Sequence, residues 1–289
     1  MTVVLTGAGG QLGRAVIAAA KSAGIAITAH DRAALDIADA DAVHRAVDGA
    51  SVVINAAAYT DVDRAEGDLL ETWRVNCSGP AVLADACNEG GAALLHISTD
   101  YVFDGNDRKA YTERDAVSPL GAYGASKAEG EEAIADSLKR HVILRTAWLF
   151  SATGRSFVRS MLTAARTRDE LSVVSDRHGC PTAADDLAGA VLHVAQAMAQ
   201  PKHKHWGIYH YCGAPPTTWF KFAEAIFAHH PKPPKLVPIS GKDWPAPAPR
   251  PDNAVLDCKK IKRDYGLEQP DWRAALGPVV AAIMAEGAT

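Results

Sequence analysis

The sequence has few of the features that mark secreted, membrane-spanning or nucleic-acid-binding proteins. Its net charge is −4 and it contains no long basic run, so we expect no nucleic-acid partner. No stretch approaches the ~18 uninterrupted apolar residues of a membrane span, and we expect none. No C-x-x-C pair occurs, which argues against a zinc or disulfide framework and favours reduced thiols in a cytoplasmic protein. The five cysteines are Cys77, Cys87, Cys180, Cys212 and Cys258.

The first residues also lack the basic region of a signal peptide, and we expect no such peptide. Thr2–Thr6 is instead a β-branched run of strand length, followed by Gly7, Gly10 and Gly13 and then by an Ala-rich helical stretch. Strand, glycine-rich turn and helix in this order are typical of dinucleotide-binding units. Gly7 permits the tight turn, Gly10 lets the backbone approach a pyrophosphate, and Gly13 lets the helix pack on the strand.

The residues after the second expected strand, Ile25–Ala29, bear on the choice between NAD and NADP. Asp31 can accept from a ribose 2′-hydroxyl, which favours NAD, whereas Arg32 can pair with a 2′-phosphate, which favours NADP. Because both are present, the sequence leans only slightly to NADPH over NADH. Asp36 has two interpretations of equal weight: a bond to the adenine amino group, or a cap for a helix over about 38–47.

Strands alternate with helices through the first half of the chain. The expected strands are Thr2–Thr6, Ile25–Ala29, Ser51–Asn55, Ala92–Ile97 and His141–Arg145. This alternation predicts an α/β fold with a Rossmann-type doubly wound parallel sheet, in a dinucleotide-binding domain over residues 1–150. The pattern then loosens, and we expect residues 151–289 to form mainly a smaller mixed α/β substrate-binding lobe. The helix near 183–199 should return to the first domain.

Two segments of the second half invite other interpretations. Residues 231–251 hold eight of the 16 prolines, which predicts an ordered lid or a disordered linker and excludes a regular helix or central strand. Histidines gather at two places, but neither place has the spacing or partner carboxylate of a metal site. We therefore predict no metal ligands there. These histidines are His203, His205, His229 and His230.

Polar residues that could do chemistry follow the fourth expected strand and open a later helix. Thr99 lies at the end of that strand, where open parallel sheets bind ligands, and can hydrogen-bond a substrate carbonyl. Tyr123 and Lys127 stand four residues apart and share one helix face. A lysine ammonium beside a tyrosine lowers the phenol's pKa from about 10, which suits acid–base work near neutral pH. Alone, the Tyr–Lys spacing also fits an exposed helix pair, and the rest of the chain decides against that interpretation. Thr99 alone also fits a turn or capping hydroxyl, and the presence of Tyr123 and Lys127 decides against it.

Eight stretches spread in order over nearly the whole chain match one family pattern. They are residues 7–13, 35–37, 55–66, 98–105, 123–127, 145–148, 176–182 and 250–253. With them the chain resembles the extended short-chain dehydrogenase/reductases and, within these, the dTDP-4-dehydrorhamnose reductases. The combination is far more specific than any single stretch.

The resemblance implies an activity and a set of site residues. Hydride would pass from NADPH or NADH to C4 of dTDP-4-dehydro-6-deoxy-L-mannose, giving dTDP-L-rhamnose in the last step of its biosynthesis. The implied catalytic residues are Thr99, Tyr123 and Lys127. The implied cofactor-binding residues are Gly7, Gly10, Gln11, Leu12, Asp31, Arg32, Asp36, Ile37, Ala58, Tyr59, Thr60, Tyr123 and Lys127. The implied substrate-binding residues are Thr99, Asp100, Tyr101, Trp148 and Arg250.

The chain departs from the family pattern at two places. Some members bind Mg²⁺ at a dimer interface through a Glu just after the glycine motif, whereas this chain has Arg14 and Ala15 there. A metal-bridged dimer is therefore doubtful, and a homodimer without metal stays open. Ala254 stands where the family usually has Ser, which removes one hydroxyl from the substrate loop.

Two other functions fit parts of the pattern. A sugar-nucleotide 4-epimerase or 4,6-dehydratase of the same superfamily shares the motifs, although a dehydratase usually needs an acid/base pair and Asp100 has no Glu beside it. A relative of this fold serves as a non-catalytic regulatory subunit of methionine adenosyltransferase. The intact set of Thr99, Tyr123 and Lys127 does not exclude that role.

Overall fold

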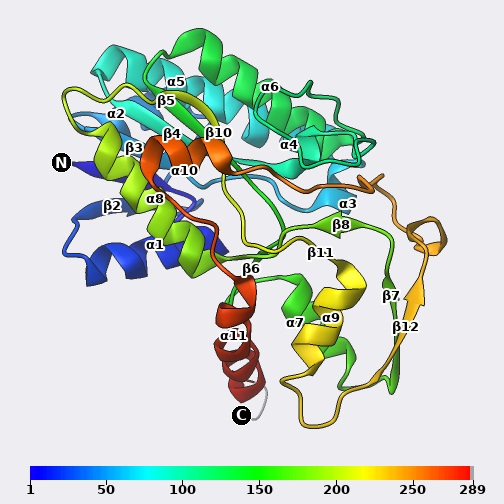
Figure 1. Cartoon of the computed structure of the whole chain (residues 1–289). Helices are drawn as coiled ribbons and strands as arrows, with labels where there is room; N and C mark the ends of the chain where they lie inside the picture. The colour runs from blue at the N-terminus through cyan, green and yellow to red at the C-terminus, as the bar shows by residue number, and fades with distance from the viewer. Residues whose placement is uncertain (287–289) are drawn as a thin grey trace.

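The computed structural model describes residues 1–286 and is built around a six-stranded parallel sheet (Figure 1). The strand order is β10-β5-β4-β3-β1-β2, and all neighbours are parallel. The strands are β1 (Val3–Thr6), β2 (Ile27–His30), β3 (Val52–Asn55), β4 (Ala93–Thr99), β5 (His141–Thr146) and β10 (Gly207–His210). The five expected strands and the doubly wound class are confirmed, and β10 is an addition that the sequence did not predict.

Helices cover both faces of the sheet because its central strands are apolar on both sides. One face carries α1 (Gln11–Ser22), α8 (Ala184–Met198) and α10 (Lys259–Tyr265), which share one buried core with the sheet. The other carries α2 (Ala40–Val47), α5 (Gly79–Gly90) and α6 (Ala122–Ser137) around a second core. No helix within residues 1–286 has both the length and the apolar character that crossing a bilayer requires.

The helical stretch over residues 69–90 is interrupted by a π turn. α4 (Leu69–Trp73) runs into the π turn η1 (Arg74–Ser78), and α5 follows directly. Asn76 in this turn is fully buried and bonds the backbone of Tyr59 and the hydroxyl of Ser126. Single π turns inside α-helices are frequent at functional sites, and this one lies beside the pocket described below.

A smaller lobe lies below the sheet in the view of Figure 1. Its core gathers aromatic and aliphatic side chains around Phe150, Phe222 and Trp272. The lobe contains α7 (Phe157–Ala164), α9 (Trp219–Phe227), α11 (Trp272–Glu286) and the parallel pair β7 (Glu170–Val174) with β12 (Lys235–Ile239). Shorter elements are α3 (Val62–Ala65), η2 (Asp100–Val102), β6 (Leu149–Phe150), β8 (His178–Gly179), β9 (Thr182–Ala183), β11 (Thr217–Thr218) and η3 (Gly241–Asp243). A domain division at residue 150 stays a prediction.

The proline-rich segment 231–251 is ordered, so the disordered-linker interpretation is wrong. β12 lies inside it and pairs with β7 over five positions, Pro238 included. A two-stranded sheet has only edge strands, where a missing proline N–H can face away from the ladder. A lid role for the segment is untested.

Candidate functional site

The glycine-rich turn after β1 packs against the loop after β3. Gly7 has a φ of +75°, and a Cβ there would lie 2.4 Å from the backbone nitrogen of Ala57. A Cβ on Gly13 would lie 2.2 Å from the carbonyl oxygen of Gly7. α1 starts directly after this turn, and the N–H groups of its first turn have no partner within the helix. Such a helix start suits a phosphate group.

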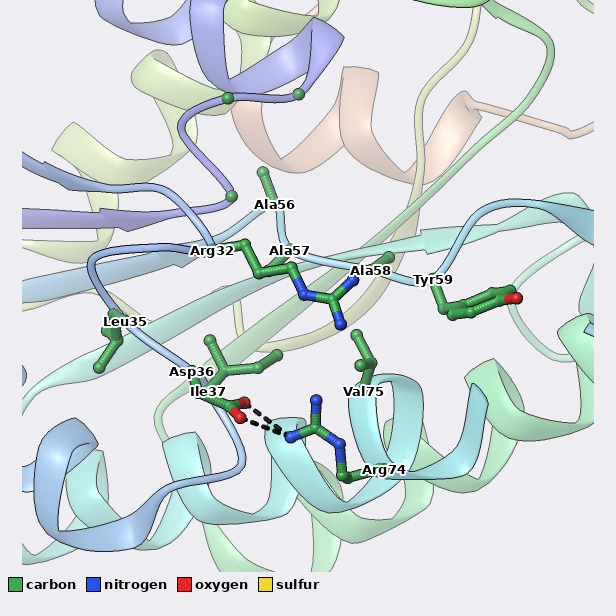
Figure 2. Close-up of a pocket in the computed structure, with 13 residues that line it drawn as sticks. Arg32, Leu35, Asp36, Ile37, Ala56, Ala57, Ala58, Tyr59, Arg74 and Val75 are labelled. Carbon is green, nitrogen blue, oxygen red and sulfur yellow. Dashed lines mark hydrogen bonds and ion pairs between the residues drawn. The ribbon is translucent and has the colours of Figure 1, made fainter. Parts of the chain in front are cut away.

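A pocket runs from this turn past the ends of β2 and β3 (Figure 2). It is lined by Gly7, Gly9, Gly10, Arg32, Leu35, Asp36, Ile37, Ala56, Ala57, Ala58, Tyr59, Arg74 and Val75. Most predicted cofactor residues therefore lie together. Asp31 is absent from this lining, and its Oδ1 accepts from the backbone nitrogens of Ala33 and Ala34. The structure thus places Arg32, and not Asp31, in the pocket wall.

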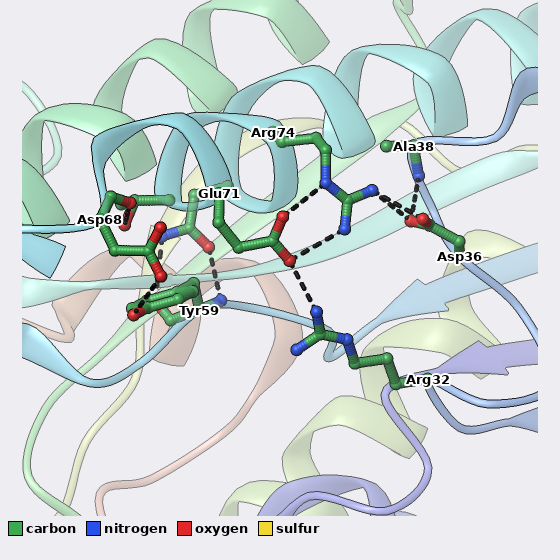
Figure 3. A network of polar contacts seen from close by, with 9 residues as sticks. Arg32, Asp36, Ala38, Tyr59, Asp68, Glu71 and Arg74 are labelled. Carbon is green, nitrogen blue, oxygen red and sulfur yellow. Dashed lines mark hydrogen bonds and ion pairs between the residues drawn. The ribbon is translucent and has the colours of Figure 1, made fainter. Parts of the chain in front are cut away.

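Two arginines and two carboxylates form a network at this pocket (Figure 3). Arg32 donates to Glu71 at 2.7 Å, and Arg74 donates to both oxygens of Glu71 at 2.6 and 2.9 Å. Arg74 also binds Asp36 at 2.6 Å. Hydrogen bonds with Glu71 and then Asp36 raise the pKa of Arg74 above its ordinary value. Arg74 is thus a fixed cation opposite Arg32.

The helix-cap interpretation of Asp36 is wrong. α2 begins at Ala40, and Asp39 caps it by accepting from the backbone nitrogen of Ala42. Asp36 instead accepts from the backbone nitrogen of Ala38, which is the largest cause of its lowered pKa. Its side chain remains in the pocket wall, where the adenine interpretation is untested.

A second pocket shares Gly10, Ala56 and Ala58 with the first and so continues from it. It lies at the carboxyl ends of β4 and β5, where open parallel sheets bind ligands. The predicted residues that line it are Gly10, Gln11, Leu12, Ala58, Thr60, Thr99, Asp100, Tyr101, Tyr123, Lys127 and Trp148. The structure therefore brings the three predicted catalytic side chains into one cavity.

Asp100 is the unusual acid of this cavity. It is 2% exposed, and its Oδ1 accepts from the Thr99 hydroxyl at 3.0 Å. Its Oδ2 has no hydrogen-bond partner within residues 1–286. Burial raises the pKa of Asp100 to about 7. Near neutral pH the Asp100 carboxyl, which lines the cavity, is therefore partly protonated.

The environment of Tyr123 differs from the sequence expectation. Burial raises the pKa of its phenol above the ordinary value, and a hydrogen bond with Thr99 opposes that rise. The expected lowering by Lys127 is not found, because the Lys127 Nζ bonds His96 Nε2 at 2.9 Å and the Ile97 carbonyl at 2.7 Å. Burial lowers the pKa of Lys127 itself to about 8. Tyr123 thus stays a protonated phenol, the form that a proton donor needs.

Trp148 has a strained backbone. Its φ is +43°, a rare conformation for a bulky residue that often marks a functional site. Its ring stacks on Trp219 with 3.5 Å between ring centroids, and Gly179 makes room for it. The stack forms one wall of the second pocket.

A third pocket extends into the lobe and shares Tyr101, Phe157 and Trp219 with the second. Its basic side chains are Arg168, Arg177 and Arg250. Arg250 is not free: it pairs with Asp63 at 2.8 Å and donates to the carbonyl of Ala248. Burial and the pairing with Asp63 act in opposite directions on its pKa, which is raised. This pocket suits an anionic ligand with a flat apolar part.

Metal ligands are not gathered anywhere in the described chain. No group of three or more His, Cys, Asp or Glu within residues 1–286 could hold a metal ion. His203 and His205 instead contact Tyr265: its hydroxyl bonds His203 Nε2 at 3.2 Å and the His205 carbonyl at 2.5 Å. Arg14, at the place of the family's Mg²⁺-binding Glu, donates to the carbonyl of Gly9.

These pockets suit a nicotinamide dinucleotide next to a second ligand. Gly7 leaves no room for a side chain, α1 offers unpaired N–H groups, and the cavity continues from there to Lys127. A doubly wound sheet with this turn, and with a Tyr and a Lys on α6 facing the end of β4, defines the extended short-chain dehydrogenase/reductase class. Within that class the family described as RmlD substrate binding domain matches residues 1–285, and the chain belongs to this family.

Known proteins resemble the chain over its whole length. A dTDP-4-dehydrorhamnose reductase from Aggregatibacter actinomycetemcomitans is 41% identical over 283 residues, covering 95% of this chain and 96% of its own. The crystal structure of a dTDP-4-dehydrorhamnose reductase from Clostridium acetobutylicum ATCC 824 matches with a TM-score of 0.92 at 35% identity, covering 98% and 100% of the two chains. A dTDP-4-dehydrorhamnose reductase from Bacillus anthracis str. Ames, in complex with NADP, gives 0.89 at 31% identity, with 99% of each chain covered.

Proposed function

We propose that this chain reduces the C4 keto group of dTDP-4-dehydro-6-deoxy-L-mannose to give dTDP-L-rhamnose, with NADPH as the preferred hydride donor. One observation carries the proposal. Thr99, Tyr123 and Lys127 line a single cavity that continues into the pocket of the glycine-rich turn. The three reductases compared above bear the name of this activity.

The side chains of the cavity have complementary roles in the proposed reaction. The bound cofactor supplies the hydride. In the free protein the Thr99 hydroxyl donates to Asp100. With substrate bound it would turn to donate to the C4 oxygen as negative charge develops there, and Tyr123 would deliver its phenolic proton to that oxygen. Lys127 lies beside them with its amino group held by the backbone of β4, and it orients the nicotinamide ribose.

The preference for NADPH is supported by the two arginines of the first pocket. Arg32 and Arg74 both line it, whereas Asp31 lies outside this lining and its Oδ1 accepts from the backbone of its own turn. Planar guanidinium groups bind phosphate oxygens in pairs. A 2′-phosphate would therefore meet two cations, and a 2′-hydroxyl would gain little from either.

The nucleotide end of the substrate fits the third pocket. Arg177 and Arg250 line it together with Trp219 and Trp244, which offers cations to a diphosphate and aromatic faces to a base. Tyr101 lines both this pocket and the catalytic cavity. A nucleotide sugar lying across the two would present its sugar to Thr99 and Tyr123.

Cofactor oxidation by the purified protein tests the proposal. Substrate is made in situ from dTDP-glucose by the upstream dehydratase and epimerase, with NADPH and NADH run in parallel. We expect rapid oxidation and dTDP-L-rhamnose as product. Cofactor that binds but is never oxidised would reject the reductase. A tightly retained NAD would then favour an epimerase or dehydratase, and a stoichiometric transferase partner would favour the regulatory subunit.

We also propose a cytoplasmic location. All five cysteines are unpaired in the described chain, and the sulfurs of Cys212 and Cys258 lie 3.7 Å apart, well beyond the about 2.05 Å of a disulfide bond. Disulfides are rare in a reducing compartment. A homodimer stays a prediction that a mass measurement in solution would test.

A further inference from the structure

Four buried polar side chains form a continuous chain from β1 to α6. They are Thr6, Asn55, His96 and Lys127, each at most 1% exposed. The Thr6 hydroxyl donates to Asn55 Oδ1 at 2.7 Å, and Asn55 Nδ2 lies 2.9 Å from His96 Nδ1. His96 Nε2 lies 2.9 Å from Lys127 Nζ. No local sequence pattern connects these residues, which come from three strands and a helix.

The direction of the hydrogen bonds in this chain is fixed by one backbone group. The amide nitrogen of Ala57 donates to Asn55 Oδ1 at 3.0 Å. A backbone N–H can only donate, so the oxygen of the Asn55 side chain must face it and the NH₂ group must face His96. The NH₂ group can only donate as well. His96 Nδ1 is therefore an acceptor.

The tautomer of His96 follows from this direction. Burial and the neighbouring Lys127 lower the pKa of His96 well below its ordinary value, so the ring is neutral. A neutral imidazole carries one hydrogen, and with Nδ1 accepting, that hydrogen is on Nε2. The Nε2–H bond points at Lys127 Nζ.

A lysine ammonium cannot accept this hydrogen. It has three N–H donors and no lone pair, whereas the neutral amine has a lone pair and two N–H donors. As an amine, Lys127 accepts from His96 and donates to the carbonyl of Ile97, which lies 2.7 Å away. As an ammonium, Lys127 has no lone pair for this hydrogen, so the N–H groups of the two residues face each other without a hydrogen bond. Protonation of Lys127 therefore costs one buried hydrogen bond.

We propose that His96 is a positioning residue for Lys127, with its tautomer fixed by Asn55, and that its Nε2–H group favours the neutral amine. This inference deepens the proposed function and rests on it, because Lys127 is a reacting-site residue only there. The Nε2–H group of His96 makes the Lys127 proton exchangeable near neutral pH. The charged residue with a resolved effect on the pKa of Lys127 is Glu131, one turn along α6, which raises it. Other charged residues on elements packed against α6 are Asp63, Arg64, Glu71, Arg74, Asp85, Glu89, Asp100 and Arg145.

Substitution Asn55→Asp should reverse the direction of the hydrogen bonds from Asn55 to Lys127, with little change in side-chain shape. A carboxylate keeps the bond from Ala57 and now accepts from His96 Nδ1, so the histidine hydrogen moves to Nδ1 and Nε2 becomes an acceptor for an ammonium. The titration of Lys127 is followed by NMR of its Cε in protein labelled with ¹³C-lysine, with the signal assigned by its loss in Lys127→Met. We expect a midpoint at or below about 8 in the parent protein. In Asn55→Asp it should rise by at least ~1 pH unit.

Two further variants separate the effect of hydrogen-bond direction from the effects of added charge and of altered packing. His96→Gln adds no charge and can turn its carbonyl oxygen to Lys127, so it should also raise the midpoint, even if Asn55→Asp does not fold. Thr6→Val removes the first hydroxyl but leaves Ala57 to fix the amide, so it should leave the midpoint unchanged. An unchanged midpoint in His96→Gln would overturn the proposal. The titration needs no turnover. If the parent protein lacks reductase activity while His96→Gln shifts the midpoint, the proposed function is rejected and the effect of His96 on Lys127 stands.

Discussion

Arg32 and Arg74 share one oxygen of Glu71. Both guanidinium groups donate to Glu71 Oε1, at 2.7 and 2.9 Å. Both arginines line the pocket after β2, while Glu71 stands behind them and is not part of that lining. A single carboxylate thus holds two cations at one place, where a cofactor phosphate would compete with it.

Substitution Arg32→Ala should change cofactor preference more than overall activity. A charge-assisted hydrogen bond contributes about 1.5–3 kcal/mol, so we expect the ratio of kcat/KM for NADPH to that for NADH to fall at least ~10-fold. The measurement is steady-state oxidation of each cofactor at saturating nucleotide sugar. Glu71→Gln is the matched variant, and it should move the ratio the other way because it frees both guanidinium groups. Equal losses with both cofactors in Arg32→Ala would place the 2′-phosphate elsewhere.

Substitution Tyr123→Phe should lower kcat by at least ~10²-fold, the low end of a general acid's contribution. The ring stays in place and only the phenolic proton is lost, so KM for the sugar nucleotide should change little. Tyr101→Phe is the control, since Tyr101 lines the same cavity and its ring lies 5.7 Å from that of Tyr123. Near-full turnover in Tyr123→Phe would remove this residue as the acid.

Substitution Asp100→Asn should flatten the pH dependence of stability. Burial raises the pKa of Asp100 from 3.8 to about 7, so the folded protein holds a proton that the unfolded chain releases. Stability therefore falls as pH rises through this window, by ~2 kcal/mol between pH 5 and pH 7 from this group alone. Urea unfolding at pH 5 and pH 8 should show this loss in the parent protein and lack it in the variant. The same slope in both proteins would contradict the raised pKa.

Substitution Arg145→Leu should destabilise the fold without touching the cavity wall. Arg145 and Glu131 are 1% and 4% exposed and are joined by bonds of 2.5, 2.9 and 3.1 Å. Removing the arginine leaves a buried carboxylate unpaired, which typically costs ~3–5 kcal/mol. Chemical denaturation measures the loss. The double variant Arg145→Leu/Glu131→Leu should recover much of it, and a double variant as unstable as the single one would refute the pairing argument.

The strands that the sequence predicted are those with a pattern of their own. Val3–Thr6 and Val52–Asn55 are short apolar runs bounded by turn residues, and both are buried along their whole length. Gly207–His210 has no such run. It is a strand because its backbone pairs with β5 from Val142 to Arg145, a contact that no local pattern contains. The same holds for Pro238, which is in a strand only because β7 lies beside it.

The candidate site likewise contains residues that the sequence predicts and residues that it does not. Thr99, Tyr123 and Lys127 could be predicted because their chemistry is visible in the residue types and their spacing. Glu71 and His96 could not. Glu71 meets Arg32 across 39 positions and His96 meets Lys127 across 31, so their importance depends on which strand and helix ends meet. The protonation of Tyr123 and Lys127 was also out of reach, because burial dominates it.

The π turn at Arg74–Ser78 joins α4 to α5, and it makes the number of residues in this helical stretch important for the contacts on either side. An α-helix advances about 100° per residue, so deleting one residue here would rotate α4 by that angle relative to α5. Glu71 could then no longer reach Arg32 while Asn76 kept its bonds to Tyr59. Both contacts depend on the phase between two helix segments more than on the identity of the residues between them. The segment should therefore tolerate no change in its number of residues.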